Sequence, residues 1–510
     1  MVLKRYWKEI LFFSAITAYY IAGIAPDMTW LSQGGDAFDY VIGSKNMWAV
    51  RPTGYPTYIL IGWLFERLPF NDFWNLGLLS ALSSVATCVF IFLTIKHLTG
   101  NKLAPYIGAV TYAGAFLVWT QSVIPEVYTL TTLLMVMATY FALRGRWYVT
   151  AAVLAFGVGT HHLIVFAVVP LLGYLVYQRK EGLTTAKVPV CLGIGILGLL
   201  AYLQTHLCVV GEQTTTGLDR VVADSLGTLG FLYSLPLNYT WFRLTELVPV
   251  LLTSVGVGLV LPFFLIGLHK SNPEIPRGPR WLLLVLAVLP ISYYALGFLP
   301  MWIVYMVPGI AFLCILIGYG ASRLPYKRLL FIFLLVPVAL MGMNLTFYDL
   351  GRSVDPSPTT ARQFYNQLDS IPDGAIFYIH TWGEPWLATY YYLVENEYRF
   401  NMIFQSEIIH KGEHYTGYLE SQGVNMPEGL KHDPMTALPV GKYADYDCFE
   451  NFDTDWYLTD LRALNPGRPI YASVGKTNEA KYDKLHFTIM DITDIIGTRS
   501  NLIEVTPFGE

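Results

Sequence analysis

Long apolar stretches recur along the first two thirds of the chain and are separated by short clusters of charged residues. A run of about 18 or more apolar residues is long enough to cross a bilayer as a helix. The pattern therefore predicts a bundle of about eleven membrane-spanning helices. We place the spans at residues 9–26, 75–95, 103–120, 127–143, 147–159, 163–178, 188–207, 246–268, 281–298, 302–321 and 329–347.

The segment 147–178 fits either one long helix broken at His161 and His162 or two short arms. Two arms of about 15 residues would each reach about 22 Å at 1.5 Å per residue, which is short of a ~30 Å hydrocarbon core. Basic clusters flank the segment on both sides, and a single helix would place one of them on the wrong side. We therefore predict a hairpin whose tip, residues 157–162, lies below the outer membrane surface.

Residues 350–510 contain no candidate span and instead alternate short apolar runs with charged and aromatic residues. We expect strands near 374–380, 401–406, 468–474 and 485–492, and helices near 384–397 and 454–464. Strands alternating with helices predict a small α/β layer domain. The chain should thus have two domains: a transmembrane domain at 1–349, with an external first loop at 27–72, and a soluble domain at 350–510.

The composition agrees with a multi-pass membrane protein. Hydrophobic residues make up 54% of the 510 residues and charged residues 14%, whereas a soluble protein carries about 25% charged residues. The formal net charge of −4 says nothing about partners, because charges of both signs are concentrated in the loops. Nothing in the sequence resembles a nucleic-acid-binding surface, so we expect no nucleic-acid partner.

The distribution of lysine and arginine predicts which loops face the cytoplasm. Short cytoplasmic loops carry the excess of these residues, and with the N-terminus inside, sixteen of them fall on that side against five in the external loops. The cytoplasmic set is Lys4, Arg5, Lys8, Lys96, Lys102, Arg144, Arg146, Arg179, Lys180, Lys187, Lys270, Arg277, Arg280, Arg323, Lys327 and Arg328; the external set is Lys45, Arg51, Arg67, Arg220 and Arg243. The C-terminal domain is then extracytoplasmic, in a plasma membrane or endoplasmic reticulum.

The first external loop holds the most informative polar residues. Gly34 and Gly35 allow a sharp turn just before Asp36, and Asp39 falls on the same face if the segment is helical. Paired carboxylates at a membrane surface suit a general base that takes a proton from an acceptor hydroxyl. They could also bind a divalent metal, or be solvated and cap a loop helix.

Further polar residues fall in the other external loops. Glu126 precedes the fourth span, where a carboxylate could either cap the helix or take part in catalysis. His161 and His162 could bind a phosphate when protonated, or hydrogen-bond within the bundle. Three arginines could clamp a lipid phosphate or snorkel at the interface: Arg51, Arg220 and Arg243.

Several of these residues stand in motifs that follow one another in a fixed order. After the loop-one acids come Arg51-Pro52-Thr53-Gly54-Tyr55-Pro56-Thr57-Tyr58, Asn75-Leu76, Pro125-Glu126-Val127-Tyr128 and Gly157-Val158-Gly159-Thr160-His161-His162. This order resembles the GT-C-type membrane glycosyltransferases. It is most like the branch that contains the transmembrane O-mannosyltransferase of plexin-type receptors and its uncharacterised prokaryotic relatives. Segments 371–376 and 468–471 also fit, so the resemblance covers most of the chain.

The resemblance implies an inverting sugar transfer from a polyprenyl-phosphate donor at an external active site. Asp36 falls on the presumed general base, Asp39 on the second loop-one acid and Glu126 on the acid of loop two. The donor and its phosphate would be held by residues chosen from Arg51, Tyr55, His161, His162, Arg220 and Arg243. No metal is required, because basic side chains can neutralise the leaving phosphate; a divalent metal stays an open alternative.

Departures from the family pattern leave the sugar open, with mannose as one candidate. Arg51 stands where the branch has His, Thr53 replaces a Pro, and Ala37-Phe38 replaces a small residue followed by Gly. The acceptor could be a protein, a lipid or a glycan. A transporter or flippase of lipid-linked saccharides is the competing function, although such folds usually contain an internal repeat and the two halves show no convincing one.

Overall fold

The computed structural model describes the helical bundle and much of the C-terminal sheet. The described residues are 2–29, 35–48, 54–179, 187–198, 200, 277–296, 303–323, 327–347, 368, 371–379, 399–404, 417, 419–427, 431–432, 439–440, 454–475, 486–489 and 500–506. The chain divides into two compact units. The transmembrane unit comprises Met1–Asp27 and Tyr40–Arg352, and the C-terminal unit comprises Met28–Asp39 and Ser353–Glu510. The domain boundary predicted near residue 350 lies outside the described residues.

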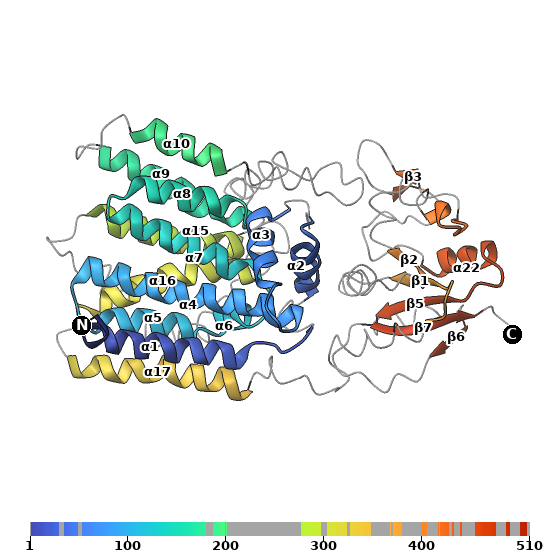
Figure 1. Cartoon of the computed structure of the whole chain (residues 1–510), viewed down its shortest axis with the longest axis horizontal. Helices are drawn as coiled ribbons and strands as arrows, with labels where there is room; N and C mark the ends of the chain where they lie inside the picture. The colour runs from blue at the N-terminus through green and yellow to red at the C-terminus, as the bar shows by residue number, and fades with distance from the viewer. Residues whose placement is uncertain are drawn as a thin grey trace. The chain divides into compact units, whose positions relative to one another are not determined.

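Helices of different lengths pack together in the transmembrane unit (Figure 1). They are α1 (Val2–Gly23), α4 (Asp72–Thr99), α5 (Ala104–Gly114), α6 (Phe116–Ser122), α7 (Val127–Leu143), α8 (Trp147–Val158), α9 (Val165–Arg179), α10 (Lys187–Gly198), α15 (Arg277–Leu296), α16 (Val307–Ala321) and α17 (Lys327–Phe347). Loop one contributes α2 (Gly35–Asn46) and α3 (Pro56–Phe65), and two 3-10 turns, η2 (His162–Ile164) and η4 (Ile303–Met306), precede α9 and α16. Each predicted span except 246–268, which lies outside the described residues, corresponds to one or two of these elements.

Length and apolar composition identify several of these helices as membrane spans. Among the described residues, three helices are long and apolar enough to cross a bilayer: 72–99, 278–295 and 303–321. The helices α6 and α7 pass the same test together but are bent by 114° at the residues between them. The protein is therefore an integral membrane protein, and the number of eleven spans stays a prediction.

The helix α4 lies in the middle of the bundle and packs against α1, α5, α7 and α16. Small residues let the backbones approach closely, as is common between membrane helices. A Cβ on Gly108 of α5 would lie 2.9 Å from the carbonyl oxygen of Cys314, and one on Gly318 would lie 3.0 Å from that of Ala104. At one end of α4, Lys96 pairs with Glu9 of α1 at 3.7 Å.

The segment 147–178 forms two helical arms, as predicted. The helix α8 ends at Val158, and the chain turns through Gly159 and Thr160 before η2 and α9. The hydrogen bond from Thr160 N to the oxygen of Gly157, 3.0 Å long, closes the turn. The helix α8 packs mainly against α7 and α10, whereas α9 packs mainly against α15. The depth of this tip in the membrane stays a prediction.

A five-stranded mixed sheet organises the C-terminal unit, with the strand order β2-β1-β5-β7-β6. The strands are β1 (Ile376–Ile379), β2 (Asn401–Phe404), β5 (Ile470–Gly475), β6 (His486–Ile489) and β7 (Ser500–Thr506), and a small ribbon pairs β3 (Lys431–His432) with β4 (Pro439–Val440). β1 runs parallel to β2 and β5, whereas β7 is antiparallel to β5 and β6. The helix α22 (Thr454–Leu464) and four of the strands confirm predicted elements. β7 was not predicted, and the helix expected at 384–397 lies outside the described residues.

Arg468 links three segments of this sheet. Its Nε donates to the carbonyl oxygen of Gly374 at 2.9 Å, its Nη1 to that of Gly423 at 2.9 Å, and its Nη2 to Oδ1 of Asn401 at 2.5 Å. Gly374 and Gly423 both have φ near +77° (76° and 77°), a left-handed conformation that favours glycine. The guanidinium thus fixes two tight turns and the start of β2 to the start of β5.

Candidate active site

The two loop-one acids lie on one helix. Gly35 begins α2, so Asp36 stands in its first turn, where the helix dipole favours a carboxylate. Asp39 follows three residues later and is only 2% exposed, whereas Asp36 is partly exposed. The helical spacing predicted for this pair is therefore confirmed, and their catalytic roles stay predictions.

A sharp turn brings the second half of loop one into α3. Gly54 has φ 72°, and Tyr55 has φ 42° and ψ 47°, a left-handed conformation that is uncommon for a residue other than glycine. Pro56 then starts α3 at the first helical position, where its fixed φ is favourable. Such a conformation persists only where neighbouring contacts hold it.

Those contacts come from the α8–α9 connection, about 100 residues further along the chain. The amide of Thr57 donates to the oxygen of Gly159 at 2.9 Å, and its hydroxyl donates to the oxygen of Phe156 at 2.8 Å. A Cβ on Gly159 would lie 2.3 Å from Oγ1 of Thr57, so only glycine allows this approach. Loop one and the histidine tip therefore form one packed substructure.

The ring of Tyr55 stacks on His161, with 5.7 Å between the ring centroids and an angle of 13° between the planes. His161 is 3% exposed, and its Nδ1 accepts a hydrogen bond from the amide of Leu163 at 3.2 Å. That bond puts the proton of the neutral ring on Nε2. Tyr128 and His162 pack against the same imidazole, with centroids at 5.2 Å and 4.0 Å.

Tyrosines from distant parts of the chain extend this group. Tyr305 of η4 lies 5.8 Å from His161, 5.7 Å from Tyr128 and 5.8 Å from Tyr293 of α15. On the loop-one side, Tyr40 lies 5.8 Å from Tyr55 and 5.1 Å from Tyr58. We call this group the aromatic cluster, and its members are Tyr40, Tyr55, Tyr58, Tyr128, His161, His162, Tyr293 and Tyr305. Tyr293 and Tyr305 stand in no motif, so no local pattern predicts them.

Burial affects the pKa of the two histidines, which lie in the connection between α8 and α9. It lowers the pKa of His161 well below its usual range, and the neighbouring His162 adds to the effect. Burial lowers the pKa of His162 in the same direction. Burial therefore favours the neutral form of both rings, in which Nε2–H of His161 can donate a hydrogen bond.

Glu126 lies at the bend between α6 and α7 and is 0% exposed. It is the N-cap residue of α7, yet its side chain makes no capping hydrogen bond. The hydroxyl of Ser80 on α4 accepts from its amide at 3.0 Å. The Glu126 side chain is thus held inside the bundle at the N-terminus of α7, where the helix dipole favours a carboxylate, and its catalytic role stays a prediction. The remaining predicted site residues, Arg51, Arg220 and Arg243, lie outside the described residues.

Comparisons with known proteins point to one class of enzyme. The family model described as the Protein O-mannosyl-transferase TMEM260 N-terminal domain matches residues 36–185. Protein O-mannosyl-transferase TMEM260 of Mus musculus is 24% identical over 206 residues, which covers 36% of this chain and 29% of the mouse protein. The aligned part is thus less than a third of that relative's length.

Solved structures extend the similarity to the whole chain. The crystal structures of ArnT from Cupriavidus metallidurans, bound to undecaprenyl phosphate and in the apo state, match with TM-scores of 0.58 and 0.59. Each match covers 98% of both chains at 13% identity. The chain has the GT-C fold. The predicted GT-C resemblance is thereby confirmed, and with it the class of polytopic helical membrane protein. Within this GT-C chain, the segment matched by the family model contains every described residue that the sequence singled out for the site.

Proposed function

We propose that this protein is an inverting membrane glycosyltransferase that moves a sugar from a polyprenyl-phosphate donor to a hydroxyl group outside the cytoplasm. One observation carries the proposal. The fold shared with ArnT, which is described in one structure as bound to undecaprenyl phosphate, extends over 98% of both chains. The match to the O-mannosyl-transferase domain begins at Asp36 itself, and it favours mannose as the sugar.

Asp36 serves as the general base in this proposal. It takes the proton of the acceptor hydroxyl while the acceptor oxygen attacks the anomeric carbon; the bond from that carbon to the donor phosphate oxygen breaks, and polyprenyl phosphate leaves. Partial exposure lets Asp36 meet an acceptor. The buried Asp39 on the same helix is suited instead to an electrostatic role.

The aromatic cluster supports a donor site next to loop one. Tyrosine rings offer flat apolar faces and hydroxyl groups together, and a neutral imidazole can donate a hydrogen bond to a phosphate oxygen. Positive charge for the leaving phosphate would then come from arginines, with Arg51, Arg220 and Arg243 as the candidates. The acceptor is a protein hydroxyl by analogy with the O-mannosyl-transferase relative, and a lipid or glycan hydroxyl is the alternative.

The proposal also includes the orientation of the protein in the membrane. The N-terminus and the basic loops face the cytoplasm, and the C-terminal unit is extracytoplasmic, on the side where the donor sugar is transferred.

Release of polyprenyl phosphate by purified protein in lipid nanodiscs tests the proposal, with a panel of polyprenyl-phosphate sugars. We expect one donor to be used, and Asp36→Asn to abolish its turnover. The matched control is Glu9→Gln, which changes an acid beside Lys96 at a distant position of the bundle. Full activity of Asp36→Asn would refute the role of Asp36 as the general base. Movement of an intact donor across vesicles without any release would favour a flippase.

A further inference from the structure

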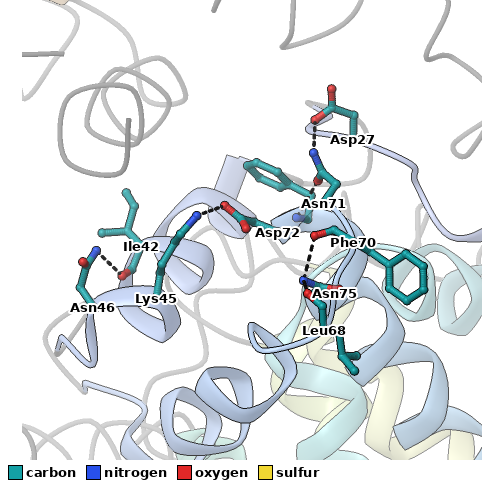
Figure 2. Close-up of polar contacts among 10 residues, drawn as sticks. Asp27, Ile42, Lys45, Asn46, Leu68, Phe70, Asn71, Asp72 and Asn75 are labelled. Atoms are coloured by element: carbon teal, nitrogen blue, oxygen red, sulfur yellow. Dashed lines mark hydrogen bonds and ion pairs between the residues drawn. The ribbon is translucent and has the colours of Figure 1, made fainter. Parts of the chain in front are cut away.

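The turn between α3 and α4 contacts both ends of the segment that carries the loop-one acids (Figure 2). At the start of the segment, Nδ2 of Asn71 donates to Oδ1 of Asp27 at 3.3 Å. At its end, Nζ of Lys45 pairs with Oδ2 of Asp72 at 2.6 Å. Asn71 and Asp72 are consecutive residues, so one point of the chain holds both ends of a nineteen-residue stretch (27–45).

This point is rigid because the turn is tied into α4. Oδ1 of Asn71 accepts from the amide of Phe73 at 2.9 Å and so caps the helix. Asn75, which is 1% exposed, donates through Nδ2 to the oxygens of Leu68 and Phe70, each at 3.2 Å (Figure 2). The anchoring residues therefore take their positions from the central helix of the bundle.

The Lys45–Asp72 pair joins two helix ends of suitable polarity. Lys45 stands in the last turn of α2 and Asp72 in the first turn of α4, and each charge is favoured by the dipole of its helix. The Lys45 side chain is 41% exposed and that of Asp72 is 18% exposed. Exposed ion pairs contribute little to overall stability, so the contact is better explained by what it positions.

We propose that Asn71 and Asp72 form an anchor that sets the position of α2, and with it Asp36 and Asp39, for sugar transfer. Asp36 lies nine residues from both Asp27 and Lys45. The part of α2 between Lys45 and Asp36 is about 13 Å long. A rotation of the helix about the anchor therefore displaces the Asp36 carboxylate. Misplacement by about 1 Å can cost on the order of a hundredfold in rate. Asn71 and Asp72 are thus positioning residues, and this role rests on the proposed function.

The test compares Asp72→Asn, Lys45→Ala and the swapped pair Lys45→Asp with Asp72→Lys. The matched control is Lys96→Ala, which breaks the ion pair with Glu9 at the other end of α4. For Asp72→Asn and Lys45→Ala we expect kcat for donor release to fall about tenfold or more, with KM for the donor within about twofold. The swapped pair should recover part of that loss, and Lys96→Ala should leave both constants unchanged.

Amide hydrogen exchange in residues 35–48 gives a second readout that needs no turnover. Exchange there should become faster in Asp72→Asn than in wild type, and it should stay unchanged in Lys96→Ala. If residues 35–48 of Asp72→Asn exchange at wild-type rates, the proposed anchoring role is wrong. It is also wrong if kcat of Asp72→Asn stays within about twofold of wild type. If wild-type protein releases no polyprenyl phosphate, the proposed function fails, while the exchange result still decides whether the anchor holds α2.

Discussion

Replacing Gly159 by alanine tests whether the histidine tip and loop one form one packed substructure. The new Cβ would lie 2.3 Å from Oγ1, 3.0 Å from Cβ and 3.0 Å from the backbone nitrogen of Thr57. No rotation of a short β-branched side chain relieves the contact with the backbone nitrogen, so the two segments must separate. Separation lengthens both hydrogen bonds made by Thr57, to Gly159 and to Phe156.

The magnitude follows from these contacts. Overpacking a close contact costs about 1–3 kcal/mol, and each of the two lost hydrogen bonds contributes about 0.5–1.5 kcal/mol. Together the free energy of unfolding should fall by about 2–6 kcal/mol. The stacking of Tyr55 on His161 depends on the same approach, so donor turnover should fall as well.

Thermal unfolding in nanodiscs measures this effect, with Gly173→Ala as the matched control. Gly173 lies within α9, and a Cβ there would meet nothing within 4 Å. Glycine to alanine inside a helix is favourable by about 0.5–1 kcal/mol, so the control should unfold at or slightly above the wild-type temperature. Equal unfolding midpoints for the two variants would refute the proposed packing of loop one on the tip.

Three further substitutions test other contacts. Burial, with the Asp72 carboxylate adding to it, raises the pKa of Glu66 to about 9, so the folded state keeps a proton that the unfolded state releases above its own pKa of about 4.3. Stability should thus fall as the pH rises from 5 to 8, and Glu66→Gln should remove most of that slope in unfolding midpoints. Arg468→Ala should lower the stability of the C-terminal unit by about 1–3 kcal/mol, seen as faster proteolysis of that unit; an unchanged rate would contradict it. Gly114→Ala should destabilise the bundle, since its Cβ would lie 2.6 Å from the oxygen of Pro337, and a wild-type unfolding midpoint would show that α5 and α17 can move apart.

Much of the fold could be predicted because its elements depend on local pattern. The run 127–143 has the bounds of α7, and basic clusters at both ends of 147–178 predicted two arms where length alone allowed one helix. In the C-terminal unit, α22 also matches its predicted range, 454–464. Strand β7 escaped prediction because its stability comes from pairing with β5 and β6 on both sides.

The candidate site could be predicted only where its residues stand in motifs. Asp36 and Asp39 were identified by their helical spacing within loop one. The stacking of Tyr55 on His161 joins residues more than a hundred positions apart, and Tyr305 enters from a 3-10 turn with no sequence signal of its own. The lowered pKa of His161 likewise depends on burial, which no local pattern reveals.

The helix α4, which carries the anchor of loop one at its N-terminus, is longer than the hydrocarbon core is thick. Its 28 residues span about 42 Å, whereas the hydrocarbon core is about 30 Å thick. The excess has to be taken up by tilting or by projection beyond the core. Because Asn71 and Asp72 stand at the tip of this helix, we expect the hydrophobic thickness of the host membrane to influence how loop one is held at the membrane surface.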